Sequence, residues 1–204
     1  MYKGKLKRQN LSVDMAAMCD IAFLILIFFI LCANPKPQRP VDVERPLASG
    51  GIYDPGEGNF KIILAQGKTM VELENRDRAK VLTKMGEKYH ISFTAVELAK
   101  FDKIETVGVP MAAMKQFIDG YYNVKAFMEQ PGIRMDSKNN ELFDWLIAAR
   151  QVSKENHGYD LSMMIDADKS AMYPEIKNVI NTLESQKIFK FELMHDIKHS
   201  KAVI

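Results

Sequence analysis

The chain has 204 residues and a net charge of +2 at pH 7, from 28 Lys and Arg against 26 Asp and Glu. This length suits one or two small domains, and the balanced charge gives no sign of a nucleic-acid-binding protein. The two cysteines, Cys19 and Cys32, both lie in or beside one apolar stretch. A disulfide framework in the rest of the chain is therefore excluded.

The most apolar part of the chain, residues 15–33, is predicted to form a membrane-spanning helix. It holds one charged side chain in nineteen residues and no Gly or Pro. A helix of this length is about 28 Å long, close to the ~30 Å hydrocarbon core of a bilayer, and Asn34-Pro35 ends it. A cleaved signal peptide and a buried core helix are the alternatives, but the stretch is longer than a typical signal-peptide core and contains an acid.

The acid in this stretch is Asp20. A carboxylate costs about 2.5–3.5 kcal/mol at the centre of a membrane helix and less near its ends. Asp20 either reaches the headgroups or caps the helix, or it faces a protein partner and gains and loses a proton, since desolvation favours the neutral form. Helical spacing places Ala16, Leu24 and Ile27 on the same face, where the small Ala16 permits close approach of a partner helix. Asp14 is interpreted as a helix N-cap.

Residues 34–59 are predicted to form a linker. The segment "NPKPQRPVDVERP" contains four prolines, which favour an extended chain. The segment "ASGGIYDPGEGN" that follows contains four glycines and is expected to be flexible.

The remainder, residues 60–204, is predicted to fold as a small two-layer α/β domain. Stripes of Met and aromatic side chains at helical spacing are interpreted as its core, as in Leu142, Trp145, Leu146 and Ala149. We expect, in chain order, a hairpin over 60–65 and 69–74, a helix over 75–90, a short helix after the capping box Thr94 to Glu97, a helix from Pro110 and a helix over 136–156.

The C-terminal part predicts a strand, a helix and a second strand. Apolar and polar residues alternate in "YDLSMMI", residues 159–165, and again in "FKFELMH", residues 189–195. A helix starting at Tyr173-Pro174 lies between them. This order predicts a parallel pair of strands joined by a helical crossover.

The sequence does not favour an enzyme. It contains no Gly-rich phosphate loop, and His195 and His199 have the spacing of metal ligands on a helix but fall at a strand end and in the C-terminal tail. Asp166 and Asp168 resemble part of a calcium loop, yet no Glu completes the twelve-residue pattern. We interpret them as shaping a turn, and we expect neither a metal nor an organic cofactor.

Two stretches of the chain resemble the ExbD/TolR family. The first, "LSVDMAAMCDIAFLILIFFILCANPKPQRPVDV", has a polar residue six positions before a lone Asp, an aliphatic and aromatic span, and an exit into "VDV". The second, "MIDADKSAMYPEIKNVINTLESQKIFKFELMHD", has an "ADK" turn, a Tyr, an amphipathic helix and a last strand. In this resemblance Asp20 falls on the family's transmembrane aspartate. The family's linker motif, a region expected to bind a partner, appears with its first two letters exchanged as Pro46, Leu47, Ala48 and Ser49.

The resemblance implies a proton-driven membrane motor. Two copies of the chain would pass their helices through a pentameric ExbB-like membrane protein, and Asp20 would be protonated and deprotonated in turn as protons flow inward. A TonB-like protein would receive the work and open outer-membrane transporters. Protons are then the coupling ion. A TolR-like subunit of an envelope-integrity motor, and a single-span anchored binding domain without proton chemistry, are the alternatives.

The resemblance also implies a location and a domain order. Four Lys and Arg precede the apolar helix and three closely follow it, which favours an N-terminus inside the cell. We therefore expect a single-pass protein of the inner membrane with a cytoplasmic basic tail over 1–14, a transmembrane helix over 15–33, a periplasmic linker over 34–59 and a periplasmic domain over 60–204, of which 75–157 is partly an insertion.

Overall fold

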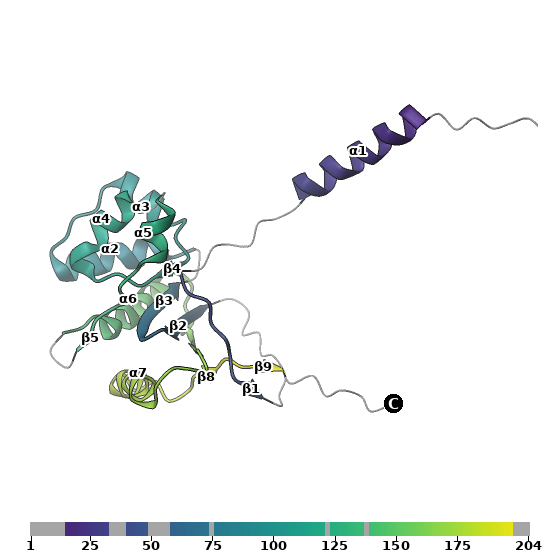
Figure 1. Ribbon diagram of the computed structural model, residues 1–204. Helices are drawn as coiled ribbons and strands as arrows, with labels where there is room; N and C mark the ends of the chain where they lie inside the picture. The colour runs from purple at the N-terminus through teal and green to yellow at the C-terminus, as the bar shows by residue number, and fades with distance from the viewer. Residues whose placement is uncertain are drawn as a thin grey trace, which may run out of the picture. The chain divides into compact units, whose positions relative to one another are not determined.

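In the computed structural model, the chain divides into two compact units, Met1–Gln38 and Arg39–Ile204, which are described separately (Figure 1). The structure describes residues 15–32, 40–48, 58–73, 76–120, 123–136 and 139–197. The first unit contains one apolar helix, and the second is a small mixed α/β domain. This arrangement confirms the fold class predicted from the sequence.

The helix of the first unit is α1, Met15–Cys32. Its sequence contains neither Gly nor Pro, so nothing in it interrupts the backbone hydrogen bonds of a helix. None of its side chains is buried within the structure. The predicted last residue of the span, Ala33, lies outside the described residues, as does Asp14.

The centre of the second unit is a five-stranded sheet with the order β4-β3-β2-β7-β8. The predicted hairpin is confirmed: β2 and β3 are antiparallel and joined at Gln66 and Gly67, which both have positive φ. Such a two-residue turn matches the twist of the strands. The predicted parallel pair of β7 and β8 is also confirmed. The strands are β2 Asn59–Ala65, β3 Lys68–Leu73, β4 Thr106–Val107, β7 Ser162–Ala167 and β8 Glu192–Leu193.

The strand β7 differs from its prediction in position and burial. It begins at Ser162 instead of Tyr159, and its last five residues are all buried, including Met164, which alternation placed on a polar face. The reason is its place in the sheet: β7 lies between β2 and β8 and is parallel to both. Interior parallel strands are covered on both faces.

The predicted helices appear in the expected order, and α5, Val124–Met128, is an additional short helix that was not predicted. The helices α2 to α5 lie together at one end of the domain, while α6 and α7 lie along the sheet (Figure 1). Two pairs of two-residue strands complete the domain, β5 with β6 and β1 with β9. The bounds are α2 Arg78–Tyr89, α3 Ala95–Phe101, η1 Met111–Ala113, α4 Met114–Asp119, α5 Val124–Met128, α6 Glu141–Asn156, α7 Tyr173–Ser185, β1 Leu47–Ala48, β5 Met135–Asp136, β6 Asn139–Asn140 and β9 Asp196–Ile197.

Local capping chemistry sets two of the helix starts. The predicted capping box is confirmed, because Thr94 and Glu97 each accept a hydrogen bond from the other's backbone N–H. The helix α6 starts later than the predicted 136, because the Asn140 side chain accepts a hydrogen bond from the backbone N–H of Phe143. Asn is a favoured N-cap residue.

The two faces of the sheet are covered differently. Phe60, Ile62 and Leu64 of β2 point into the main core beneath the helices, together with the fully buried Trp145 of α6. On the other face, a smaller apolar cluster contains Val41, Ile63, Ala65 and Met70. Val41 belongs to the segment predicted to be a linker, so part of that linker covers the second face of the sheet.

Candidate functional site

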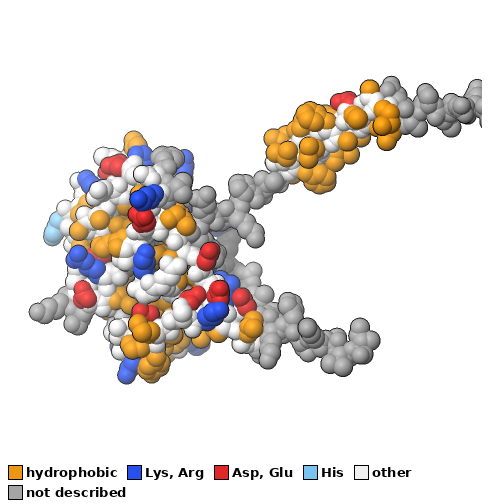
Figure 2. Space-filling model, in the orientation of Figure 1, with side chains coloured by type: hydrophobic (Ala, Val, Ile, Leu, Met, Phe, Trp, Pro, Cys, Tyr) orange, Lys and Arg blue, Asp and Glu red, His pale blue; other side chains and the backbone are white. Residues whose placement is uncertain are grey.

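The helix α1 has the length and composition of a membrane span. At 18 residues it is about 27 Å long, close to the hydrocarbon thickness of a bilayer. It is the one helix within the described parts of the chain that could cross a membrane by these criteria. The visible face of α1 is apolar and carries a single acidic side chain (Figure 2).

Asp20 supplies the only acid of α1. It is the sixth residue of the helix, which places it about 7.5 Å along the axis from Met15 and about 18 Å from Cys32. The carboxylate thus lies toward the N-terminal end of the span. No ion pair among the described residues includes it. A proton, water or a partner from outside the chain could therefore reach this group.

The residues predicted to accompany Asp20 lie on the same side of α1. Ala16, Leu24 and Ile27 are three or four residues apart from one another or from Asp20 along one regular helix, so they form one stripe. None of them is buried by the chain itself. This stripe is available to another protein or to lipid.

The motif Pro46 to Ser49 occupies the start of the folded unit. Leu47 and Ala48 form β1, which pairs in parallel with β9, and the carbonyl oxygen of Pro46 accepts a 3.0 Å hydrogen bond from the backbone N–H of Asp196. The Leu47 side chain is 67% exposed despite this pairing. Ser49 lies outside the described residues.

We call residues 40–48 the strap, because they run in an extended form over the second face of the sheet and end at β1 (Figure 1). Within residues 41–45 of the strap, Val41, Val43 and Arg45 are buried or half-buried, whereas Asp42 and Glu44 are exposed. This alternation is that of a strand with one covered side. The sequence predicted an extended chain here, but its attachment to the domain was missed.

The strongest polar contact of the strap is the ion pair between Arg45 and Asp166. The guanidinium Nε and Nη2 donate to the two carboxylate oxygens over 2.7 and 2.8 Å. The Asp166 side chain is fully buried in β7, while that of Arg45 is 22% exposed. The hydrogen bond to Asp166 raises the pKa of Arg45 above its usual value. The sequence had suggested that Asp166 shapes a turn. Its carboxylate instead binds Arg45 of the strap.

Asp168 has the role predicted for it. Its Oδ1 accepts hydrogen bonds from the backbone N–H and the hydroxyl of Ser170, which fixes the turn after β7. These bonds lower the pKa of Asp168 below its ordinary value. Its Oδ2 also accepts a 2.7 Å bond from the backbone N–H of Glu44. Lys169 extends this link, because its N–H donates to the Glu44 carbonyl and its ammonium group pairs with the Glu44 carboxylate.

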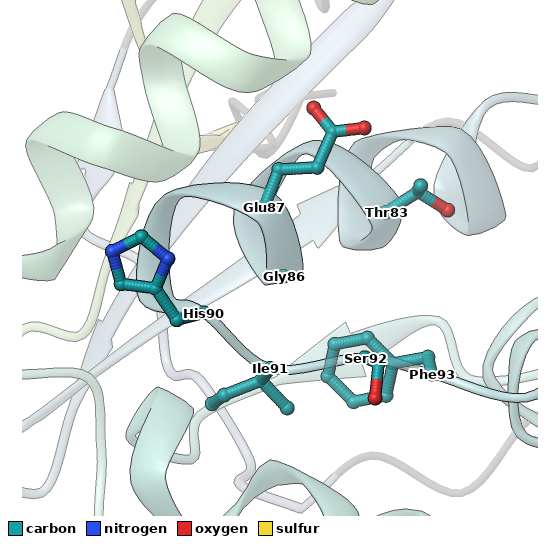
Figure 3. A pocket seen from close by; sticks show the side chains of 7 residues that line it. All are labelled: Thr83, Gly86, Glu87, His90, Ile91, Ser92 and Phe93. Carbon is teal, nitrogen blue, oxygen red and sulfur yellow. The ribbon is translucent and has the colours of Figure 1, made fainter.

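A pocket of about 450 Å³ lies at the C-terminal end of α2 (Figure 3). Gly86 permits the following segment to approach the helix, since a Cβ there would lie 2.4 Å from the carbonyl oxygen of Ile91. The side chains of Glu87 and His90 project away from Ile91 and Phe93 (Figure 3), so the polar groups do not converge on one point. The lining is Thr83, Gly86, Glu87, His90, Ile91, Ser92 and Phe93.

The spacing of His195 and His199 raised a metal site as an alternative. Within the described residues, no group of three or more His, Cys, Asp and Glu side chains is placed to hold a metal ion. His195 follows β8, and its Nδ1 lies 3.4 Å from the carbonyl oxygen of Leu193. His199 lies outside the described residues.

The sequence matches the family described as "Biopolymer transport protein ExbD/TolR" over residues 6–197. The chain belongs to the ExbD/TolR family. The match extends across α1, the strap and the sheet, and it also includes residues 75–157. The resemblance found at the two ends of the sequence is thereby confirmed.

A curated relative in Vibrio cholerae, "Biopolymer transport protein exbD2", is 29% identical over 75 residues. The matched region covers 37% of this chain and 56% of the relative, so the chain spans little more than half the length of the relative that it matches. No solved structure matches the chain.

Proposed function

We propose that this chain is a motor subunit driven by the proton-motive force, which works with an ExbB-like pentamer to energise a TonB-like protein for outer-membrane transport. Membership of the ExbD/TolR family supports this function. The observation that carries the proposal is Asp20, the acid within the apolar helix α1. Its chemistry is proton uptake and release, and protons are the coupling ion.

The energy that the membrane potential gives to each proton is large enough to change contacts between helices. One charge that crosses a membrane potential is worth about 2.3 kcal/mol per 100 mV. Single polar contacts between helices in lipid contribute on the order of 1 kcal/mol. A few protons per step would therefore shift α1 from one packed arrangement to another.

The proposed assembly follows from the two regions of the chain. The stripe of Ala16, Asp20, Leu24 and Ile27 would face the ExbB-like pentamer or the helix of a second copy, and lipid would cover apolar side chains elsewhere on α1. The excess of Lys and Arg before the helix supports a cytoplasmic N-terminus in the inner membrane. The folded unit would then be periplasmic and would transmit the work.

The test of this function is Asp20→Asn. Asn resembles a protonated Asp in shape and polarity, so α1 should still insert and assemble, but Asn cannot release a proton. We expect uptake of a TonB-dependent substrate to fall to background in cells that carry only this variant. Membrane levels and co-purification of the ExbB-like partner should match the wild type.

The matched control is Cys19→Ser, which changes the neighbouring residue at nearly the same depth and leaves the carboxylate in place. It should support normal uptake. Wild-type uptake by the Asp20→Asn strain would overturn the motor role and would favour an anchored binding domain without proton chemistry. An intact complex with a TolA-like protein in place of a TonB-like one would favour the envelope-integrity role.

A further inference from the structure

The strap packs on the second face of the sheet, where Val41 and Val43 contact the smaller apolar cluster. In the register of the sheet, Met70 of β3, Ile63 of β2 and Asp166 of β7 are neighbours in one row of the second face. All three are buried, and Val41 packs in the same apolar cluster as Met70 and Ile63. The row therefore places a carboxylate next to apolar side chains, where a charge without a partner is unfavourable.

Arg45 is the partner that this carboxylate needs. It makes a two-pronged contact with Asp166, and its Nη1 also lies 3.6 Å from a carboxylate oxygen of the half-exposed Asp196. A guanidinium that donates two hydrogen bonds to one carboxylate makes a strong contact with a defined orientation. The ion pair thus fixes which part of the strap lies above β7.

The remaining contacts of the strap are the apolar packing of Val41 and Val43, the hydrogen bonds of Glu44 and Pro46, and the pairing of β1 with β9. Glu44 exchanges backbone hydrogen bonds with the Asp168 carboxylate and with Lys169, and Pro46 accepts one from Asp196. None of the described strap residues belongs to the main core beneath the helices. The strap can therefore leave the sheet without disrupting that core.

We propose that the strap is a releasable latch whose hold depends on the Arg45–Asp166 ion pair. In the docked state, seven residues, 33–39, separate α1 from the strap. Release adds the strap itself and residues 49–57, eighteen in all, to the chain that joins α1 to β2. At full extension these residues add about 60 Å of reach. The gain in reach is measured from the membrane, so it rests on the proposed anchoring by α1. Release of the strap does not rest on that anchoring.

Hydrogen–deuterium exchange on the full chain in detergent tests the latch. The amides of Glu44, Lys169 and Asp196 report docking, since each donates a hydrogen bond between strap and domain. In Arg45→Gln, we expect these amides to exchange at least tenfold faster, while the amides that pair β2 with β7 keep their wild-type rates. Lys84→Gln, which removes an ion pair between α2 and α6, is the matched control and should leave the three amides unchanged.

Two further variants keep the test decisive. Asp166→Asn should release the strap as Arg45→Gln does, and the exchanged pair Arg45→Asp with Asp166→Arg should restore protection. Unchanged exchange in Arg45→Gln would overturn the proposal. Equal acceleration across β2 and β7 would also overturn it, because the ion pair would then stabilise the whole domain.

The reach of the folded unit from α1 is measured as the distance between two spin labels on the chain in lipid nanodiscs. The labels are placed at Cys32 and at Lys190→Cys, an exposed position, in a Cys19→Ser background. Arg45→Gln should shift the distances to longer values and broaden them, and the wild type should give the narrower distribution. Identical distributions would show that the strap does not control reach. Neither measurement depends on Asp20, so failure here is separate from failure of the motor function.

Discussion

The two units of the chain place a carboxylate among apolar groups in opposite ways. In the folded unit, Asp166 is fully buried and Arg45 of the same chain neutralises it over 2.7 Å. In α1, Asp20 has no ion pair among the described residues, and none of the helix is buried by the chain. The first carboxylate has its partner within the folded unit, whereas the second is exposed on α1.

This difference shows how each region obtains its stability. The folded unit has an internal core around Trp145, so its structure depends on contacts between its own side chains. None of α1 is buried by the chain, and in the proposed function lipid or partner helices would cover its apolar surface. Changes in the two regions should therefore affect different measurements.

The largest expected effect on folding is that of Leu146→Ala in α6. Leu146 is fully buried, and truncation of such a residue lowers the free energy of unfolding by about 2–5 kcal/mol. Leu24→Ala, the same truncation in α1, should change the unfolding of the domain by less than about 0.5 kcal/mol. Urea unfolding of the full chain in detergent measures both, with the fluorescence of Trp145, the single Trp, as the signal. A similar loss in Leu24→Ala would show that α1 contributes to the domain's core.

A smaller loss of stability is expected when a methyl group is added at Gly86. In Gly86→Ala the new Cβ would lie 2.4 Å from the carbonyl oxygen of Ile91. The segment after α2 must then shift, and we expect a loss of about 1–3 kcal/mol in the free energy of unfolding. Ala22→Val in α1 adds two methyl groups at an exposed position and should leave domain unfolding unchanged. Full stability of Gly86→Ala would mean that the segment after α2 moves freely.

The smallest effect concerns pH. The bonds from Ser170, and the one from Glu44, lower the pKa of Asp168 from its ordinary 3.8 in the folded state. A carboxyl group of this kind stabilises the fold above its unfolded pKa, and the stabilisation is lost as pH falls through the folded pKa. Wild-type unfolding temperature should therefore decline from about pH 4 downward, and Asp168→Asn should decline less steeply. Parallel curves for the two proteins would contradict this.

The carboxyl group of Glu141 should change stability with pH in the opposite direction and serves as a control. Burial raises the pKa of its carboxyl group above the ordinary value, although the Met111 backbone N–H bond opposes this. The folded state then binds more protons than the unfolded state, so stability falls as pH rises above the unfolded pKa. Glu141→Gln keeps an oxygen acceptor for Met111 and should reduce this fall. Thermal unfolding between pH 4 and 7, compared with the wild type, measures it.

The predictions from sequence were most accurate where local chemistry decides. The capping box at Thr94, the hairpin turn at Gln66-Gly67 and the helix from Tyr173 all appear where they were expected. Each depends on hydrogen bonds or backbone angles within a few residues. The bounds of β7 were less accurate, because burial on both faces removes the alternation that identifies a strand.

The sequence by itself determined the apolar helix, the position of Asp20 in it and the family, because hydropathy and short motifs are properties of neighbouring residues. Only the tertiary structure decided that residues 40–48 cover the second face of the sheet and that Arg45 meets Asp166. These two residues are 121 positions apart, and each alone looks like an ordinary surface charge. Their pairing exists only once β7 lies inside the sheet and the strap crosses it, and that arrangement depends on packing across the whole domain.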